Sequence, residues 1–221
     1  MKFLYLCFLV CLYAGVSANG VSDAELKSAA GNSAFIRIAS YNVEFSKSTT
    51  PEQVGKMFKP FKLDLIGFNE VPDGEWTARV GKVLGMHHCY VGKISSAHHK
   101  DKYKSILSRT PLVNMQEFPL EVEKGWNPAS VVRVETTVNG ITLAFYALHI
   151  CRSAVGDGHS KLLVEKILPQ DKMSRIVLAG DFNSCLGNPD MNTIKRSGMR
   201  SAWCDLKIDL KSNFTYNALD T

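Results

Sequence analysis

The stretch that decides the fold is IVLAGDFNS, residues 176–184. Its apolar start, 176–179, is typical of a buried strand. Asp181 and Asn183 follow where that strand ends, which is where α/β folds usually build their sites. The stretch therefore predicts a buried strand with a candidate site at its end.

Other apolar runs place polar side chains in the same way. Asn42 lies in ASYNVEF, and Asn69-Glu70 follow the apolar strand 65–68. His149 lies in AFYALHI. Carboxylate and amide oxygens that converge from separate strand ends suit Mg²⁺ or Mn²⁺ better than zinc. An imidazole beside a metal-bound phosphate donates a hydrogen bond or a proton, so His149 is a candidate catalytic residue.

Each of these residues also has a purely structural interpretation. A glutamate after a strand, such as Glu70, is usually a solvated turn residue. Asp181 with Asn183 is also the pattern of an Asx turn or a helix cap. His149 in an apolar strand is also typical of a satisfied core residue. The presence of all of them in one chain favours a functional site.

Strands and helices alternate along the rest of the chain. Thr50-Pro51-Glu52-Gln53 forms a capping box with proline at the first helical position, which predicts a helix to about Lys59. Asn139-Gly140 between two apolar runs predicts a β-hairpin. Because this hairpin interrupts a simple βαβ alternation, we predict a mixed α/β fold with sheet layers between helices. The other expected elements are strands at 35–43 and 63–68 and helices at 76–84, 160–169 and 188–198.

Composition limits the class of protein. The chain has 221 residues, of which 45% are hydrophobic and 21% charged, and this fits one globular domain. Intrinsic disorder, collagen-like structure and coiled coil are excluded. The formal net charge of +5 favours polyanionic partners such as nucleic acid.

The N-terminus is typical of a secretory signal peptide. Lys2 precedes the apolar run Phe3–Ala14, and the small residues of Val16-Ser17-Ala18 suit cleavage. The run is shorter than the roughly 20 residues that span a bilayer, so a stable membrane anchor is not expected. We therefore predict a signal peptide at 1–18, a lead-in at 19–34, one domain over 35–221 and an extracellular location.

Cysteine usage agrees with export. After cleavage the chain keeps Cys89, Cys151, Cys185 and Cys204, which favours two disulfides with three possible connectivities. We favour Cys185 with Cys204 and Cys89 with Cys151. The spacing does not match a zinc site. Asn213 begins the one N-glycosylation sequon.

The motifs and their order resemble those of the endonuclease/exonuclease/phosphatase superfamily, which includes deoxyribonuclease I. The resemblance covers roughly 35–215 and implies a four-layered α/β/β/α sandwich with two mixed sheets that hydrolyses phosphate esters with Mg (or Mn). The matching runs are Tyr41-Asn42, Asn69-Glu70, SILSRTP at 105–111, LHI at 148–150 and GDFNS at 180–184.

The resemblance also implies roles for single residues. Glu70 would be the principal metal ligand, with Asn42 beside it. Asp181 would position or deprotonate the attacking water, Asn183 would hold phosphate oxygens, and His149 would hydrogen-bond the scissile phosphate. Tyr103 would contact a phosphate. Lys104 of the basic stretch and Arg109 of the SILSRTP run are further candidate substrate-binding residues.

The sequence departs from the family pattern at several places. Asn69 stands where Gln is usual, and Ala147-Leu148 precedes His149 where Asn-Thr is common. The family's closing Ile-Asp-x-Ile strand and Ser-Asp-His do not occur within the 221 residues. We therefore expect a domain that is incomplete at its C-terminus and lacks the last strands.

Three functions remain open. The first is a secreted, Mg-dependent, deoxyribonuclease-like phosphodiesterase whose basic stretch 98–104 binds DNA. The second is a phosphoesterase of the same superfamily with another substrate: a sphingomyelinase that docks on a phospholipid head group through Trp126, or an inositol-phosphate phosphatase, as Trp203-Cys204-Asp205 suggests. The third is a catalytically impaired fragment that binds polyanions. No motif speaks to oligomerisation.

Overall fold

The protein folds into two β-sheets flanked by helices. The computed structural model describes residues 10–11, 35–123, 125–151 and 158–208. Most of the predicted signal peptide, the lead-in and Asn213 lie outside these residues. The first sheet has the strand order β1-β2-β3-β5-β4. Its strands are β1 (Val10–Cys11), β2 (Arg37–Asn42), β3 (Leu65–Val71), β4 (His88–Val91) and β5 (Tyr103–Ser108).

The second sheet has the strand order β6-β7-β8-β9. It contains the predicted hairpin, in which Asn139 and Gly140 have φ angles of 51° and 78° and so form the tight turn that their residue types favour. Its strands are β6 (Val113–Pro119), β7 (Ser130–Val138), β8 (Ile141–His149) and β9 (Ile176–Asp181).

Each sheet contains one parallel pair, and these two pairs carry the candidate site. β2 runs parallel to β3, with Asn42 opposite Asn69. β8 runs parallel to β9, with His149 opposite Asp181. The carboxyl ends of parallel partners lie at the same edge of their sheet, so the polar residues of each pair emerge side by side.

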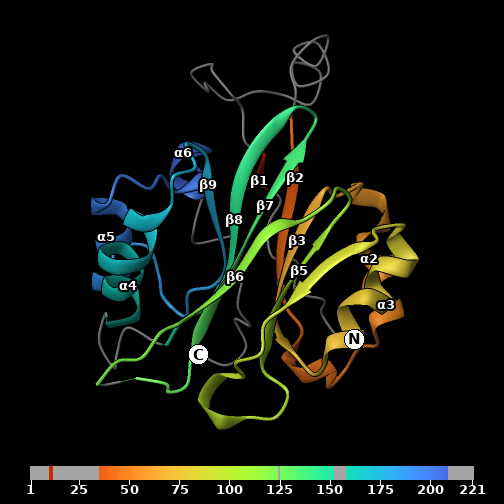
Figure 1. The fold of residues 1–221 in the computed structure, drawn as a ribbon, viewed down its shortest axis with the longest axis horizontal. Helices are drawn as coiled ribbons and strands as arrows, with labels where there is room; N and C mark the ends of the chain where they lie inside the picture. The colour runs from red at the N-terminus through yellow and green to blue at the C-terminus, as the bar shows by residue number, and fades with distance from the viewer. Residues whose placement is uncertain (1–9, 12–34, 124, 152–157, 209–221) are drawn as a thin grey trace.

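Helices cover the outer face of each sheet. α2 (Pro51–Phe58) and α3 (Gly74–Leu84) lie against the first sheet, while α4 (Gly158–Leu162) and α5 (Pro189–Arg196) lie on the side of the second (Figure 1). The predicted capping box at Thr50 and Gln53 is formed. The shorter helical segments are η1 (Glu44–Ser46), η2 (Lys59–Phe61), η3 (Ser96–His98), η5 (Leu163–Ile167), η6 (Leu168–Gln170) and α6 (Ala202–Asp205).

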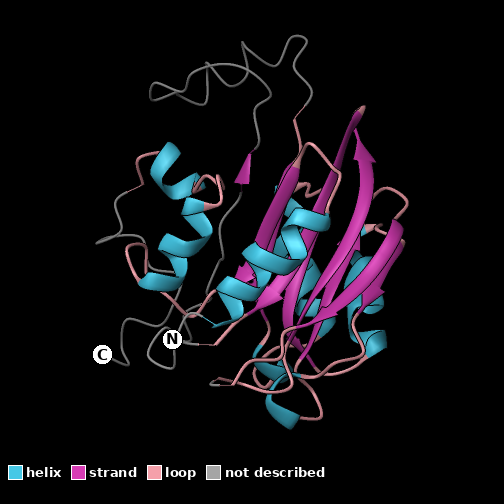
Figure 2. Cartoon of the chain, turned by 60° about the vertical axis from the view of Figure 1, so that its left-hand side comes forward, coloured by secondary structure: helices cyan, strands magenta, loops and turns pink. Residues whose placement is uncertain are grey.

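Three apolar clusters hold the layers together. One lies between the first sheet and its helices and includes Phe58 and Trp76. The second fills the space between the sheets and includes Ile38 and Phe145. The third, with Leu163, joins the second sheet to its helices. Figure 2 shows the strands between the two groups of helices. This arrangement confirms the predicted α/β/β/α sandwich with two mixed sheets.

The two predicted disulfides are not formed. Cys89, Cys151, Cys185 and Cys204 are free thiols. Cys89 packs on the helix side of the first sheet. Cys151 follows β8, and its backbone N–H donates to Nδ1 of His159 in α4, on the other side of the sandwich. Packed sheets lie about 10 Å apart, beyond the roughly 7 Å between Cα atoms that a disulfide can bridge. Cys185 and Cys204 are both exposed thiols.

No helix in the described ranges combines the length and the apolar character needed to cross a bilayer.

Candidate functional site

Four strand ends from the two sheets meet at one edge of the sandwich. Asn42 Nδ2 at the end of β2 donates a hydrogen bond of 3.0 Å to Asp181 Oδ2 at the end of β9. His149 Nε2, at the end of β8, lies 3.8 Å from Glu70 Oε1 and 3.8 Å from Asp181 Oδ2. Residues more than 100 positions apart in the chain thus form one polar cluster, which we call the strand-end cluster: Asn42, Glu70, His149 and Asp181.

Backbone geometry turns Glu70 into this cluster. The pairing of β3 with β5 shifts register between Phe68 and Val71. Glu70 lies in this shift with a φ of 55°, in the left-handed region that non-glycine residues rarely adopt. A bulge of this kind redirects a side chain. The neighbouring Asn69 donates from Nδ2 to the Leu148 carbonyl at 2.6 Å and so ties the two sheets together.

Asn183 supports Asp181 from a tight turn. Its backbone N–H donates to Asp181 Oδ1 at 2.9 Å, so the Asx turn considered as a structural interpretation is present. Its side-chain Nδ2 donates to the Ile150 carbonyl at 3.0 Å. The first bond holds the carboxylate of Asp181, and the second fixes the turn that carries Asn183 to the end of β8.

Burial changes the protonation behaviour of the cluster. Desolvation raises the pKa of Glu70, and hydrogen bonding by Asn42 and the charge of Lys102 partly oppose that rise. Desolvation lowers the pKa of His149 to about 4, against the opposing charge of Asp181. His149 is therefore a neutral imidazole at pH 7. At 3.8 Å its contacts with the two carboxylates are too long for hydrogen bonds.

The donor atoms suit a hard divalent cation. Glu70 is a mostly buried carboxylate that a second acid, Asp181, further destabilises. Asn42 adds an amide oxygen, which here accepts from the Glu44 N–H. The described ranges hold no ready-made group of three or more His, Cys, Asp or Glu side chains for a metal. One or two carboxylates with water completing the shell is the usual arrangement for Mg²⁺, so the residues fit that ion.

Two side chains outside the predicted site set border the cluster. The Trp126 ring stands edge-on to the His149 ring, with centroids 4.9 Å apart. Lys102 Nζ lies 3.8 Å from Glu70 Oε1. Trp126 thus contributes to the site wall. The sequence pointed to Lys102 only as part of the basic stretch 98–104. It pointed to Trp126 only as a side chain that could dock on a phospholipid head group.

The structure distributes the three predicted substrate-binding residues differently. Tyr103 packs against the helix-side core of the first sheet. Lys104 is fully buried, and its ammonium donates to the Ile94 carbonyl and Ser96 Oγ. Arg109 follows the far end of β5 and donates to the Leu63 carbonyl. At about 3.3 Å per residue, Arg109 lies about 20 Å from the start of β5. None of the three belongs to the strand-end cluster.

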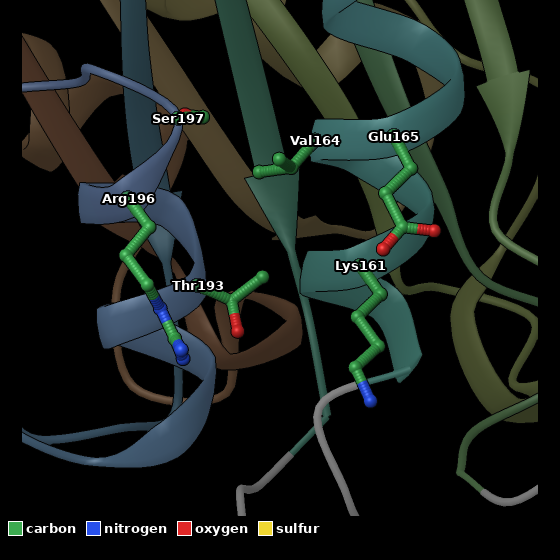
Figure 3. Close-up of a pocket in the computed structure, with 6 residues that line it drawn as sticks. All are labelled: Lys161, Val164, Glu165, Thr193, Arg196 and Ser197. Carbon is green, nitrogen blue, oxygen red and sulfur yellow. The ribbon is translucent and has the colours of Figure 1, made fainter.

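A separate open hollow of about 440 Å³ lies between two helical segments on the side of the second sheet (Figure 3). It shares no residue with the strand-end cluster. Its lining residues are Lys161, Val164, Glu165, Thr193, Arg196 and Ser197.

Comparison with known proteins finds relatives by fold alone. No protein-family model and no curated protein matches the sequence. An endonuclease/exonuclease/phosphatase family protein from Leptotrichia buccalis is similar over 74% of this chain and 73% of its own, with 16% identity and a TM-score of 0.55. A mannosyl-6-phosphatase from Bacteroides thetaiotaomicron gives 18% identity and a TM-score of 0.59 over 74% and 71%. Sphingomyelinase C from Streptomyces griseocarneus gives 13% and 0.53 over 73% and 68%.

Proposed function

The chain has the fold of the endonuclease/exonuclease/phosphatase family, and on that premise we propose that it is a divalent-metal-dependent phosphodiesterase, with DNA as its substrate. The observation that carries the proposal is the strand-end cluster, because it joins oxygen ligands, an acid and a neutral imidazole at one edge of the sandwich. Metal-assisted hydrolysis of a phosphate ester uses groups of these kinds.

Each member of the cluster has a defined task in this reaction. Glu70 and Asn42 would hold the metal. A bound divalent ion neutralises charge that develops on the phosphate oxygens. Asp181, held by Asn42 and Asn183, orients the attacking water and accepts its proton. The neutral His149 donates a hydrogen bond to a phosphate oxygen and so stabilises the transition state.

The proposal of DNA as substrate, and of export, rests on the sequence. The net charge of +5 attracts a polyanion. Lysine and histidine side chains are concentrated in the stretch 98–104, which leads into β5. The N-terminal residues have the features of a signal peptide, so the substrate would be met outside the cell.

Plasmid cleavage by the full chain tests this function. We expect nicking with Mg²⁺ or Mn²⁺ that EDTA abolishes. Asp181→Ala and Glu70→Gln should each lower the rate by about 10²–10⁴-fold, as for the loss of one catalytic group. Glu52→Gln is the matched control, because Glu52 is an acid that pairs with Arg79 on the helix surface.

Three outcomes separate the candidate functions. A folded chain that binds DNA without cleaving it under any of these conditions would overturn the nuclease proposal in favour of a polyanion-binding protein. Cleavage of sphingomyelin in vesicles, with DNA left intact, would favour a phospholipid head group as the substrate. Release of phosphate from inositol phosphates alone would favour a phosphatase.

The phospholipid alternative is supported by the similarity to sphingomyelinase C. Its expected anchor, Trp126, is half-buried and packs on His149. A half-buried ring that packs on His149 forms part of the site wall and is poorly placed to insert into a lipid surface. Vesicle binding that survives Trp126→Ala would exclude a docking role for this side chain.

A further inference from the structure

Lys102 directs a positive charge into the strand-end cluster. It ends the loop 92–102 that connects β4 to β5, and its ammonium lies 3.8 Å from Glu70 Oε1. The Lys102 side chain is only 17% exposed and the Glu70 side chain 11%. Water and salt therefore screen this pair much less than an ordinary surface ion pair.

The surroundings of Lys102 hold its ammonium in place. Nζ lies 4.7 Å from the centre of the Phe45 ring, a cation–π contact. Phe45 in turn stacks on His99, with centroids 6.2 Å apart and planes 9° from parallel. The ammonium therefore contacts both the Glu70 carboxylate and an aromatic stack.

The backbone of the loop is equally well held. Lys102 N–H donates to Ser95 Oγ at 2.9 Å, and the Lys102 carbonyl accepts from Ser96 N–H at 3.1 Å. The buried Lys104 donates from Nζ to Ser96 Oγ at 3.2 Å. Lys102 is therefore fixed at its Cα, and its four-carbon side chain is the part that can move.

The charge of Lys102 is opposite to that of the two acids in the strand-end cluster. Glu70 and Asp181 are acids in the cluster, and His149 is neutral. Within the part of the chain that the structure describes, Lys102 is the lysine that pairs with Glu70. A divalent ion on Glu70 would lie within a few ångströms of the ammonium, and two cations at that distance repel each other. Metal binding at Glu70 and the contact of the ammonium with the same carboxylate therefore oppose each other electrostatically.

We propose that Lys102 is a tethered counter-ion that competes with the divalent metal for Glu70, and that metal binding releases its ammonium to contact a substrate phosphate. The inference rests on the proposed function, because it needs a metal at Glu70. It makes Lys102 a residue that links metal binding to phosphate binding. Neither the Glu70 role nor the basic stretch implies this coupling.

Calorimetric titration of the full chain with Mn²⁺ tests the competition without reference to activity. Lys102→Met removes the ammonium but keeps an unbranched side chain, so Mn²⁺ should bind about five- to tenfold more tightly, as expected for the loss of one partly buried pair. Lys102→Arg keeps the charge and should bind Mn²⁺ as the wild type does. Lys93→Met, an exposed lysine of the same loop, is the matched control and should also bind as the wild type does.

A second titration tests the release of the ammonium. With Mn²⁺ saturating, inorganic phosphate should bind several-fold more weakly to Lys102→Met than to the wild type or to Lys93→Met. Equal phosphate affinity in Lys102→Met and in the wild type would overturn the proposal.

The remaining outcomes separate this inference from the proposed function. If the wild type binds Mn²⁺ and Lys102→Met binds it no more tightly, the counter-ion role is wrong and the metal-dependent function stands. If only Lys102→Met binds Mn²⁺, the competition is supported. If neither binds, both proposals are wrong.

Discussion

Lys104 is a charged residue that is completely enclosed in the protein. Its ammonium donates to the Ile94 carbonyl at 2.8 Å and to Ser96 Oγ at 3.2 Å, and no carboxylate contacts it directly among the described residues. Burial lowers its pKa to about 8, and the charge of Glu117 offsets only part of that effect. The sequence pattern suggested a phosphate-binding lysine, whereas the structure gives it a role in supporting the loop that carries Lys102.

The lowered pKa predicts a pH-dependent stability. Between about pH 8 and 10.5 Lys104 is protonated in the unfolded chain and largely deprotonated in the folded chain. Because the unfolded state then binds more protons, the free energy of unfolding rises with pH in this range. Relative to Lys104→Met, the wild type should gain at most about 3 kcal/mol of unfolding free energy between pH 7.5 and pH 10. Urea unfolding of both proteins at each pH measures this difference. A difference that stays constant or shrinks would contradict the lowered pKa.

At the scale of elements, the parallel pairing of β8 with β9 places His149 beside Asp181. Gly180 permits that pairing, because its φ is 150° and an added Cβ would lie 2.0 Å from the Leu148 carbonyl oxygen. The glycine of the GDFNS run therefore allows the backbones of the two strands to approach closely next to the site. This close approach of β9 to β8 places the next residue, Asp181, opposite His149.

Gly180→Ala should therefore damage both stability and activity. We expect a loss of about 2–4 kcal/mol in unfolding free energy from strain and steric conflict. Gly74→Ala is the matched control, because an added Cβ there meets no atom within 4 Å. The control should change stability by less than about 1 kcal/mol. Denaturant unfolding measures both, and a Gly180→Ala protein as stable as Gly74→Ala would contradict the close approach of the strands.

At the scale of the whole molecule, the four layers decide which residues can meet. Cys89 lies on the outer face of the first sheet, and Cys151 lies beside His159 on the side of the second. Packed strands separate the two thiols, so the predicted Cys89–Cys151 disulfide does not form. The spacing of cysteines in the sequence carries no information on this separation. The same layering brings the ends of β2, β3, β8 and β9 together.

Thiol labelling tests this arrangement. In the native protein, iodoacetamide should modify Cys185 and Cys204, which are exposed. Cys89 and Cys151 should react slowly or only after unfolding, because burial raises the pKa of both thiols. Peptide mapping by mass spectrometry identifies the modified residues. A peptide that links Cys185 to Cys204, or Cys89 to Cys151, would contradict the free thiols.

Local sequence signals predicted much of the fold. The Thr50 capping box, the Asn139-Gly140 turn and the helix end at Gly85 all form as expected, because each depends on residues that are neighbours in the chain. The apolar runs that end in Asn42, Glu70, His149 and Asp181 likewise correspond to observed strands.

Contacts between the sheets could not be predicted from the sequence in the same way. The sequence by itself determined the fold class, the strand-end residues and the chemistry that they offer, because short-range propensities and hydrophobic periodicity record them. Only the tertiary structure decided that Lys102 meets Glu70, that Arg109 lies at the far end of β5 and that Trp126 packs on His149. These contacts depend on strand register, on the bulge at Glu70 and on how two sheets pack, and residues far apart in the chain determine them jointly.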